Sequence, residues 1–413
     1  MSARPNVSFW TAAAVIIVGN WGTAAPSVVY PEYAREWGLT PIGTTTVFST
    51  YGVVLALVLI FFGGISDVIG RRAAMVTGLA FLAGGALLLA VAPSIGWLYA
   101  ARVAQGIGIG LSLGAASASL VDFNTTGHAG RPSSVNTLSN SIGLLIATVA
   151  GGAIVQYLPA PTHSTFWVLL VLTAVVLIAA LFMPRHDAFD SDANVPAKRS
   201  WRPRPIGVPR GSRRIFLASA FIGFTGLGIG GILLSLGAQI AKDLINTTNV
   251  FAQGLVLGIS SLVLGVVAIA FSRVTPKTAS VIGGIAGAVA LLLFIPASTI
   301  HSMPIFVASQ ILGGAAIGFG LLGGVGFIHR YAPAHHRAML ISAFYLVCYL
   351  AQGSVSAFGG IVATSVGLAN AILIFAPTVA VIAVAAAIIA ATTRLPGAVV
   401  PAASSIEATT AAQ

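Results

Sequence analysis

The stretch Gly63-Gly64-Ile65-Ser66-Asp67-Val68-Ile69-Gly70-Arg71-Arg72 is a short charged turn between two long apolar segments. Asp67, Arg71 and Arg72 stand out because only 7% of the 413 residues are charged and 57% are hydrophobic. Charge is costly within a bilayer, so a membrane protein that keeps three charges in one tight turn uses them for structure or for switching. The turn therefore predicts a connection between two membrane spans.

Apolar segments of about 20 residues recur along the chain, and each can cross the roughly 30 Å of a bilayer's hydrocarbon. Soluble domains average about 25% charged residues, so this composition excludes that class. We predict twelve spans, at 9–30, 43–64, 73–93, 96–121, 134–157, 164–183, 215–240, 250–271, 278–297, 304–328, 338–362 and 369–392. The predicted fold class is an all-α membrane protein with twelve transmembrane helices in two pseudo-symmetric six-helix bundles.

The net charge of +11 is explained by basic residues in the loops and does not indicate a nucleic-acid partner. With a cytoplasmic N-terminus, nearly all lysines and arginines fall in inner loops. Arg35 and Lys242 fall in outer loops, and Arg102 lies within a span. This asymmetry follows the positive-inside rule, so both termini are expected in the cytoplasm, beside the bacterial inner (plasma) membrane. The same charges are expected to attract anionic lipid of the inner leaflet.

Four segments are expected along the chain. Residues 1–183 form the N-terminal six-helix bundle, 184–214 a cytoplasmic linker, 215–394 the C-terminal six-helix bundle and 395–413 a disordered cytoplasmic tail. The linker is predicted from its acids, prolines and eight basic residues. Matching glycines and arginines recur 206 to 210 residues apart in the two halves, which indicates a parallel repeat: Gly108 and Gly318, Gly110 and Gly320, Arg131 and Arg337, Gly151-Gly152 and Gly359-Gly360.

The turn at 63–72 resembles the loop between helices 2 and 3 of the major facilitator superfamily. That loop reads glycine, three residues, aspartate, two residues, glycine and two basic residues. The residues that fall on it are Gly63, Asp67, Gly70, Arg71 and Arg72, whereas Val68 stands where the family usually has a basic residue. The resemblance implies that Arg71, paired with Asp67 or with Asp122, latches the cytoplasmic gate. The alternative is a turn that sets topology by its charge alone.

The fourth span reads Arg102-Val103-Ala104-Gln105-Gly106, which resembles the superfamily's helix-4 pattern of arginine, two residues, glutamine and glycine. Arg102 lies about 10 Å into the span at 1.5 Å per residue, so it faces protein or a wet cavity rather than lipid. Three roles remain open for it: substrate binding, influence on a proton site, or hydrogen bonds to helix-end carbonyls. The glycines that follow allow close helix packing.

In the fifth span, Ala147-Thr148 stands where the drug-exporting antiporters of the superfamily carry a glycine-proline pair, and this departure weakens the assignment to that branch without excluding it. None of the nine carboxylates and no histidine falls at the middle of a predicted span, although proton-coupled carriers often keep a deep carboxylate. Glu32, at the outer end of the first span, is the nearest candidate for proton coupling. The alternative interpretation of Glu32 is an exposed loop acid.

Spans 1, 4, 7 and 10 line the central cavity in this superfamily. The resemblance therefore implies a substrate or proton pathway through Asn20, Glu32, Arg102, Gln105, Gly106, Gln239 and Gln310. Each of the amides alternatively makes an interhelical hydrogen bond worth about 0.6–2 kcal/mol.

We therefore predict a monomeric secondary transporter that moves a small molecule by alternating access. The predicted activity is efflux of amphipathic compounds, with protons as a candidate exchange partner. The alternative is an importer or facilitative carrier of a small solute, including an anion, without proton coupling. A transporter-like sensor without flux also stays open. No enzyme activity, metal or cofactor is expected, because no catalytic or metal-ligand spacing stands out and Cys348 is the single cysteine.

Overall fold

The computed structural model describes residues 5–126, 128, 130–184, 208–209 and 212–393. Most of the predicted linker and the whole predicted tail lie outside these described residues. The described N-terminal half contains α1 (Pro5–Ala24), η1 (Ala25–Val28), α2 (Tyr30–Trp37), α3 (Pro41–Phe62), α4 (Ser66–Ile69), α5 (Arg71–Ala90), α6 (Ile95–Asp122), α7 (Arg131–Tyr157) and α8 (Pro161–Leu181). The C-terminal half contains α9 (Arg213–Asp243), α10 (Val250–Ala270), α11 (Pro276–Thr299), α12 (Met303–Tyr331), α13 (Ala334–Val366) and α14 (Leu368–Thr392).

Twelve of these helical segments are long and apolar enough to cross a membrane, which confirms the predicted number of spans. Their ends agree with the predicted ends to within a few residues. Several begin where the sequence supplies a start signal: Pro41, Pro161 and Pro276 occupy first-turn positions, where the missing N–H costs nothing. The Asn249 side chain accepts a hydrogen bond from the Ala252 N–H at 3.0 Å and thereby caps α10.

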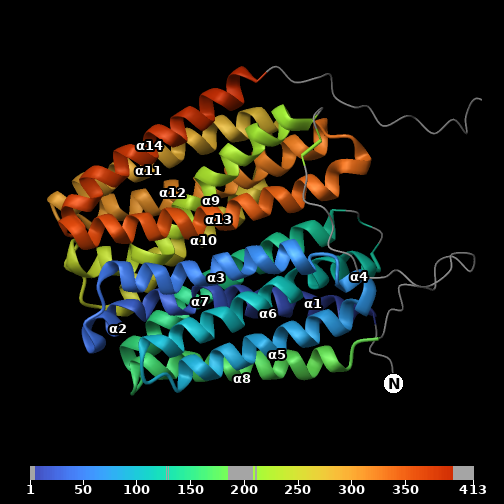
Figure 1. Cartoon of the computed structure of the whole chain (residues 1–413), viewed down its shortest axis with the longest axis horizontal. Helices are drawn as coiled ribbons and strands as arrows, with labels where there is room; N and C mark the ends of the chain where they lie inside the picture. Colours follow the sequence, from blue (N-terminus) through green and yellow to red (C-terminus); the bar gives the residue numbers. More distant parts are fainter. Residues whose placement is uncertain (1–4, 127, 129, 185–207, 210–211, 394–413) are drawn as a thin grey trace, which may run out of the picture.

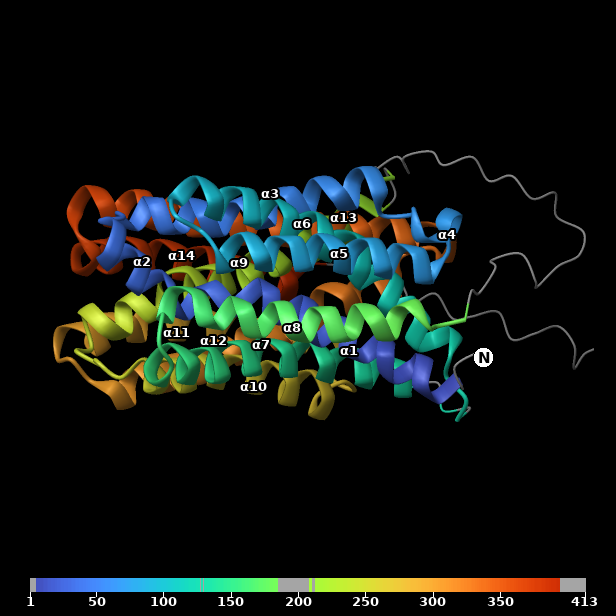
Figure 2. The ribbon, with the colours of Figure 1, turned by 90° about the horizontal axis from the view of Figure 1, so that it is seen from below.

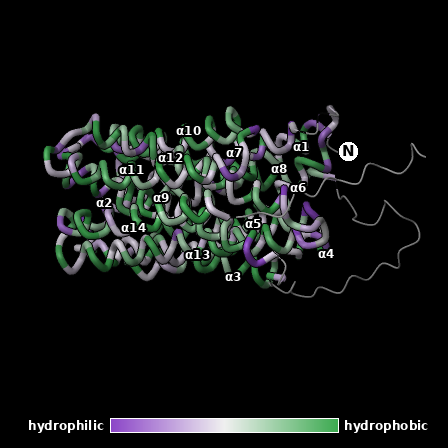
Figure 3. Tube along the Cα trace, turned by 90° about the horizontal axis from the view of Figure 1, so that it is seen from above, coloured by the Kyte–Doolittle hydropathy of each residue, from purple (hydrophilic) through white to green (hydrophobic). Residues whose placement is uncertain are grey.

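The helices form two bundles that lie side by side (Figure 1). The N-terminal half, drawn in blue to green, occupies the lower layer in this view, and the C-terminal half, drawn in yellow to red, the upper layer. Figure 2 shows the long helices running roughly parallel, with α2 near one end of the molecule and α4 near the other. We call these the α2 end and the α4 end. The described chain starts at the α4 end, where hydrophilic segments gather in Figure 3.

The two halves repeat one another, as predicted. The helix α1 begins at Pro5 and α9 at Arg213, 208 residues later, and the same displacement separates Ile95 of α6 from Met303 of α12. This displacement lies within the range at which glycines and arginines recur in the sequence.

The first predicted span, 9–30, is confirmed as the membrane-spanning segment Pro5–Val28, but this segment is not α-helical throughout. The α-helix ends at Ala24 and continues as the 3-10 turn η1, in which Pro26 has no N–H to donate to an α-helical ladder. The separate short helix α2 follows and ends at Gly38, whose φ of 63° favours glycine. After the break the chain continues into α2, which lies near the end of the molecule opposite to α4.

Two glycine-containing helix pairs join the bundles. Where α7 meets α10, a side chain at Gly152 would place its Cβ 2.8 Å from the Val250 carbonyl oxygen and 3.2 Å from Gly254 Cα. Where α13 meets α3, a side chain at Gly360 would collide with Thr45. Gly152 and Gly360 are the repeat-related glycines that the sequence singled out, so the repeat places close backbone contacts on both sides of the interface at the α2 end.

We predict that Gly152→Ala prevents full closure of the α2 end, because backbone atoms of α10 occupy the position of the new methyl group. Thr45 is fully buried in the wild type. A reporter cysteine at this position, in a protein whose native cysteine has been removed by Cys348→Ala, measures the closure. Its rate of labelling by a water-soluble maleimide is expected to rise. Gly114→Ala is the control, since nothing lies within 4 Å of a side chain there. Equal labelling rates in the two variants would contradict the assignment.

Candidate functional site

The charged turn at the α4 end owes its shape to two glycines. At Gly63 the helix α3 closes, and its N–H donates to the Leu59 carbonyl at 3.2 Å. A single turn of helix, α4, follows, and Gly70 then takes a φ of 87° immediately before α5 starts. That φ disfavours any residue with a Cβ, so Gly70 allows the sharp reversal that brings Asp67 back beside Arg71.

The sequence left open whether Arg71 pairs with Asp67 or with Asp122. In the structure Arg71 binds both carboxylates. Its Nη1 lies 2.6 Å from Asp67 Oδ1, and its Nε lies 3.5 Å from Asp122 Oδ2. Nη1 also donates to Ser66 Oγ at 2.8 Å. All three charged side chains are between 28% and 30% exposed, so each ion pair is worth at most about 1 kcal/mol. The cluster joins α4, α5 and α6, which all belong to the N-terminal bundle, and Arg72 beside it is half-buried.

Arg102 lies fully buried at the break in the first span. Its Nη1 donates to the Gly22 carbonyl at 3.2 Å, and its Nη2 to the Thr23 carbonyl at 3.3 Å. Nη1 also donates to Gln105 Oε1 at 2.7 Å, one turn along α6. The guanidinium therefore satisfies carbonyls that the end of α1 leaves free, which corresponds to the third of the roles considered for it.

Aromatic rings and a glycine complete the surroundings of this arginine. The Arg102 guanidinium carbon lies 4.9 Å from the ring centre of Tyr51 and 5.7 Å from that of Phe48, both of α3. The rings attract the cation in a region that excludes water. Gly106 lets α6 approach α3, because a Cβ there would lie 2.9 Å from the side chain of Val54. The Arg102 Nε and Gln105 Nε2 atoms have no hydrogen-bond partner among the described residues.

Asn20 belongs to a chain of hydrogen bonds that crosses the N-terminal bundle. Its Nδ2 donates to Asn140 Oδ1 of α7 at 2.9 Å, and Asn140 donates in turn to the Asn136 carbonyl at 2.7 Å. The Asn136 side chain accepts from Ser117 Oγ of α6 at 2.9 Å. These four side chains are half-buried although they lie within membrane spans, so the structure connects polar groups of α1, α6 and α7.

The two predicted pathway residues of the C-terminal bundle differ in their surroundings. Gln310 lies seven residues into α12, just as Arg102 lies seven residues into α6, and it is fully buried with neither amide atom paired among the described residues. Gln239 lies near the last turn of α9 and donates to Asp243 Oδ2 on the same helix. The structure therefore brings Gln310 into the repeat position of Arg102 and places Gln239 at the α2 end.

Glu32 is not an exposed loop acid, and that interpretation is wrong. Its side chain is 14% exposed, and its carboxylate pairs with Arg35 of α2 at 2.7 Å and with Lys242 of α9 at 3.7 Å. Lys242 Nζ also lies 3.5 Å from the Pro31 carbonyl oxygen. The sequence did not predict that Lys242 pairs with Glu32, because 210 residues separate the two side chains along the chain. Only their shared location in outer loops hinted at the pair.

The helix α2 that carries Glu32 is anchored by a tyrosine. Tyr33 is fully buried and donates to the Thr162 carbonyl at 3.0 Å, which attaches α2 to the start of α8. Burial raises the pKa of Tyr33 well above its usual range, so the hydroxyl stays a neutral donor. The position of Glu32 is therefore set by packing of the helix that bears it.

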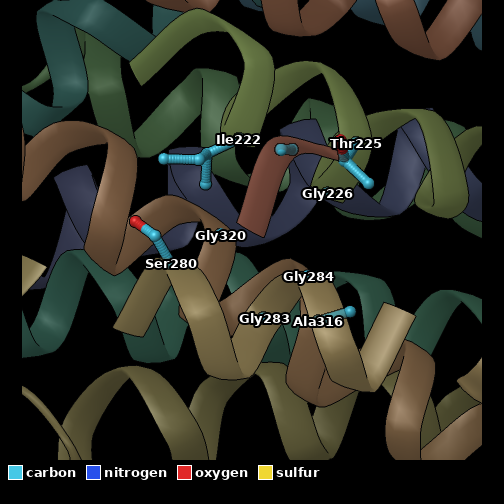
Figure 4. A pocket seen from close by; sticks show the side chains of 9 residues that line it. Ile222, Thr225, Gly226, Ser280, Gly283, Gly284, Ala316 and Gly320 are labelled. Atoms are coloured by element: carbon cyan, nitrogen blue, oxygen red, sulfur yellow. The ribbon is translucent and has the colours of Figure 1, made fainter. Parts of the chain in front are cut away.

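The described carboxylates all lie at or beyond helix ends: Glu32 and Glu36 on α2, Asp67 on α4, Asp122 at the end of α6 and Asp243 at the end of α9. One enclosed cavity lies within the C-terminal bundle, between α9, α11, α12 and α14, and Figure 4 shows Thr225 and Ser280 on its walls. Its volume is about 10 Å³, which holds at most one water molecule. It is too small for a transported solute.

Comparison with known proteins assigns the chain to a family. Residues 10–279 match the Major Facilitator Superfamily. The chain belongs to this superfamily. Among its relatives within the superfamily is YybF, an MFS-type transporter of Bacillus subtilis (strain 168), which is 26% identical over 343 residues that cover 78% of each chain.

Other relatives of this superfamily chain carry names that refer to drug resistance. The puromycin resistance protein pur8 of Streptomyces alboniger is 28% identical over 41% of this chain and 33% of its own length. The putative multidrug resistance protein MdtD of Klebsiella pneumoniae (strain 342) is 23% identical over 44% of this chain and 37% of its own. The chain thus matches only about a third of these two proteins.

Solved structures share the superfamily fold over nearly the whole chain. The nucleoside transporter NupG superimposes with a TM-score of 0.72 and 15% identity, covering 94% of this chain and 99% of its own. A POT family transporter in complex with 5-aminolevulinic acid superimposes with a TM-score of 0.73 and 16% identity, covering 93% and 94%. At such identities the likeness establishes the fold alone.

We predict that Arg102→Met lowers thermal stability, because the Gly22 and Thr23 carbonyls lose their donor in a site that excludes water. An unsatisfied buried polar group costs about 1–3 kcal/mol, so the unfolding temperature in detergent is expected to fall by several degrees. Arg102→Lys is expected to recover part of the loss, since an ammonium also donates to carbonyls. Arg330→Met, at the α4 end of α12, is the control. An unchanged unfolding temperature for Arg102→Met would contradict the capping role.

Proposed function

We propose that this chain is a secondary transporter that exports small amphipathic compounds by alternating access. The observation that carries the proposal is the set of polar contacts across the interface between the two bundles at the α2 end. The Glu32–Lys242 ion pair there links α2 to α9. Hydrogen bonds from Ile42 N–H to Thr364 Oγ1 and from Val250 N–H to Gln156 Oε1, at 2.9 and 2.7 Å, join further helices of the two bundles.

The moving units in this proposal are the two six-helix bundles, residues 1–183 and 215–394, with 184–214 as the linker between them. Partly exposed ion pairs and single hydrogen bonds each contribute about 1 kcal/mol, so such contacts break and re-form without unfolding either bundle. Rocking of the bundles about a midplane site then exposes that site alternately to each side of the membrane. The interface at the α2 end is closed in this structure.

We propose that the Asp67–Arg71–Asp122 cluster acts at the opposite, cytoplasmic end. Its three side chains rigidify the connection between α3 and α5 within one bundle, so they provide a preformed charged surface for the other bundle when the α4 end closes. The basic residues of this end, Arg71, Arg72, Arg131, Arg273, Lys277, Arg330 and Arg337, support its assignment to the cytoplasm. Gating residues of this kind need no particular substrate.

The direction and the cargo rest on the relatives. The names of two relatives refer to puromycin resistance and to putative multidrug resistance, and both names favour efflux. Asn20, Gln105, Gly106 and Gln310 are the residues that we propose for the central pathway, with Arg102 positioning the first span beside it. The protein is proposed to act as a monomer in the inner (plasma) membrane.

A second candidate is a facilitative carrier without proton coupling. The observation that favours it is the location of every described carboxylate at or beyond a helix end. Glu32, the acid that the sequence suggested for proton coupling, pairs with two cations. A carboxylate that exchanges protons during transport needs a site within the pathway.

Flux measurements in proteoliposomes separate these candidates. We predict that a panel of dyes, drugs and organic anions contains at least one amphipathic compound that the protein transports. Proton-coupled efflux predicts that an imposed pH gradient changes the direction of net transport and that the compound drives proton movement. Facilitative transport predicts rates that the gradient leaves unchanged. Binding of a compound without any flux would contradict both and favour a sensor.

We predict that Glu32→Gln weakens closure of the α2 end, because the Lys242 ammonium loses its carboxylate partner. Labelling of the Thr45 reporter cysteine is expected to speed up by up to about five-fold, the equivalent of about 1 kcal/mol. Glu36→Gln is a matched control on the same helix, where the side chain is exposed and makes no ion pair among the described residues. Labelling as slow in Glu32→Gln as in the control would contradict the gating assignment.

A further inference from the structure

The outer face of the molecule carries a groove between α1 and α8, near the α4 end. Its volume is about 460 Å³. The residues that line it are Asn6, Val7, Trp10, Thr11 and Ala14 of α1 and Val175, Val176 and Ala179 of α8. Its floor is low because Ala14 and Ala179 are small, whereas Trp10 and Val175 stand 57% and 59% exposed on its sides.

Both walls of this groove belong to membrane spans, so the surrounding medium is the bilayer. From Asn6 to Ala14 the groove descends about 12 Å along α1 at 1.5 Å per residue. This is close to the thickness of one leaflet, since the whole hydrocarbon core measures about 30 Å. The depth and the apolar lining fit an acyl chain that runs parallel to the helices. Both lining helices belong to the N-terminal bundle, and the groove faces away from the other bundle. It therefore gives no reason for a transported solute to bind.

The mouth of the groove is polar, and one positive charge lies near it. The Asn6 side chain accepts a hydrogen bond from Thr125 Oγ1 at 3.0 Å. Trp10 has the amphipathic ring that membrane proteins place at the level of the lipid headgroups. Behind these residues the Arg131 guanidinium carbon lies 4.3 Å from the ring centre of Phe9 and 6.0 Å from that of Trp10.

Arg131 is the feature that points to an anion. It is half-buried and pairs with no carboxylate in the part of the chain that the structure describes, and its Nη1, which is buried, has no hydrogen-bond partner there. The aromatic rings hold the guanidinium in place, so its charge lies at a defined position close to Trp10. An anionic lipid of the cytoplasmic leaflet gains about 1 kcal/mol from each such cation near the surface.

We propose that the α1/α8 groove binds one anionic phospholipid, with an acyl chain between Trp10 and Val175 and its phosphate beside Arg131. The occupant is a lipid of the leaflet at the α4 end. The site holds the first turns of α1 and the last turns of α8 together at the α4 end. Lipid bound there stabilises the N-terminal bundle independently of any transported compound, so the proposal stands apart from the proposed function.

The test compares phosphatidylglycerol with phosphatidylcholine, added to the detergent-purified full chain. Native mass spectrometry measures the bound lipid, and thermal unfolding measures the stabilisation. The wild type is expected to bind phosphatidylglycerol more tightly. Arg131→Gln is expected to lower the affinity for phosphatidylglycerol about five-fold, the equivalent of 1 kcal/mol, and to leave that for phosphatidylcholine unchanged. Ala179→Phe fills the groove and is expected to weaken binding of both lipids.

One control matches Arg131→Gln, and a second tests whether the effects are confined to the groove. Arg330→Gln removes another arginine that lies over a ring, that of Tyr331, at the same end of the molecule. Trp167→Ala removes an exposed tryptophan at the other end of α8. Both are expected to bind lipid like the wild type. Equal affinity of the wild type for the two lipids, unchanged binding in Ala179→Phe, or a second copy of the chain occupying the groove would overturn the proposal.

Discussion

A membrane interior offers no water to a broken helix, and this constraint connects the main features of the molecule. The first span stops being an α-helix at Ala24, and the carbonyls freed just before that point need donors. Arg102 supplies them from α6, between the rings of Tyr51 and Phe48. Because the break is satisfied there, the chain turns into α2, and α2 carries Glu32 to Lys242 in the other bundle. A buried arginine and an ion pair between the bundles are thus linked through one helix break.

The two ends of the molecule use charge differently. At the α4 end, Arg71 pairs with Asp67 and Asp122 within one bundle, so the rigid-body motion that we propose leaves the cluster intact. At the α2 end, Glu32 and Lys242 belong to different bundles, and any separation of the bundles must break their contact. Glycines make the second arrangement possible, since Gly152 and Gly360 let backbones of opposite bundles approach closely. This division supports the alternating access that we propose.

The sequence predicted local features of the molecule better than contacts between distant residues. The twelve spans, the charged turn and the repeated glycines were readable because each depends on local composition or on spacing along the chain. The pairing of Arg71 was narrowed to two acids, and the structure brings both to it. Of the two interpretations considered for Glu32, the exposed loop acid is wrong, and the break after Ala24 was missed. Gln239 was expected in the cavity, but it lies at the end of α9 beside Asp243.

The sequence by itself determined that this chain is a twelve-span helical membrane protein, because hydrocarbon thickness and the cost of buried charge act on every segment separately. It also determined which loops are basic. Only the tertiary structure decided which polar groups meet: Arg102 with the carbonyls of α1, Glu32 with Lys242, and Arg131 with the rings beside the α1/α8 groove. The physical reason is that such contacts join residues tens to hundreds of positions apart, and their energies depend on distances that helix packing alone sets.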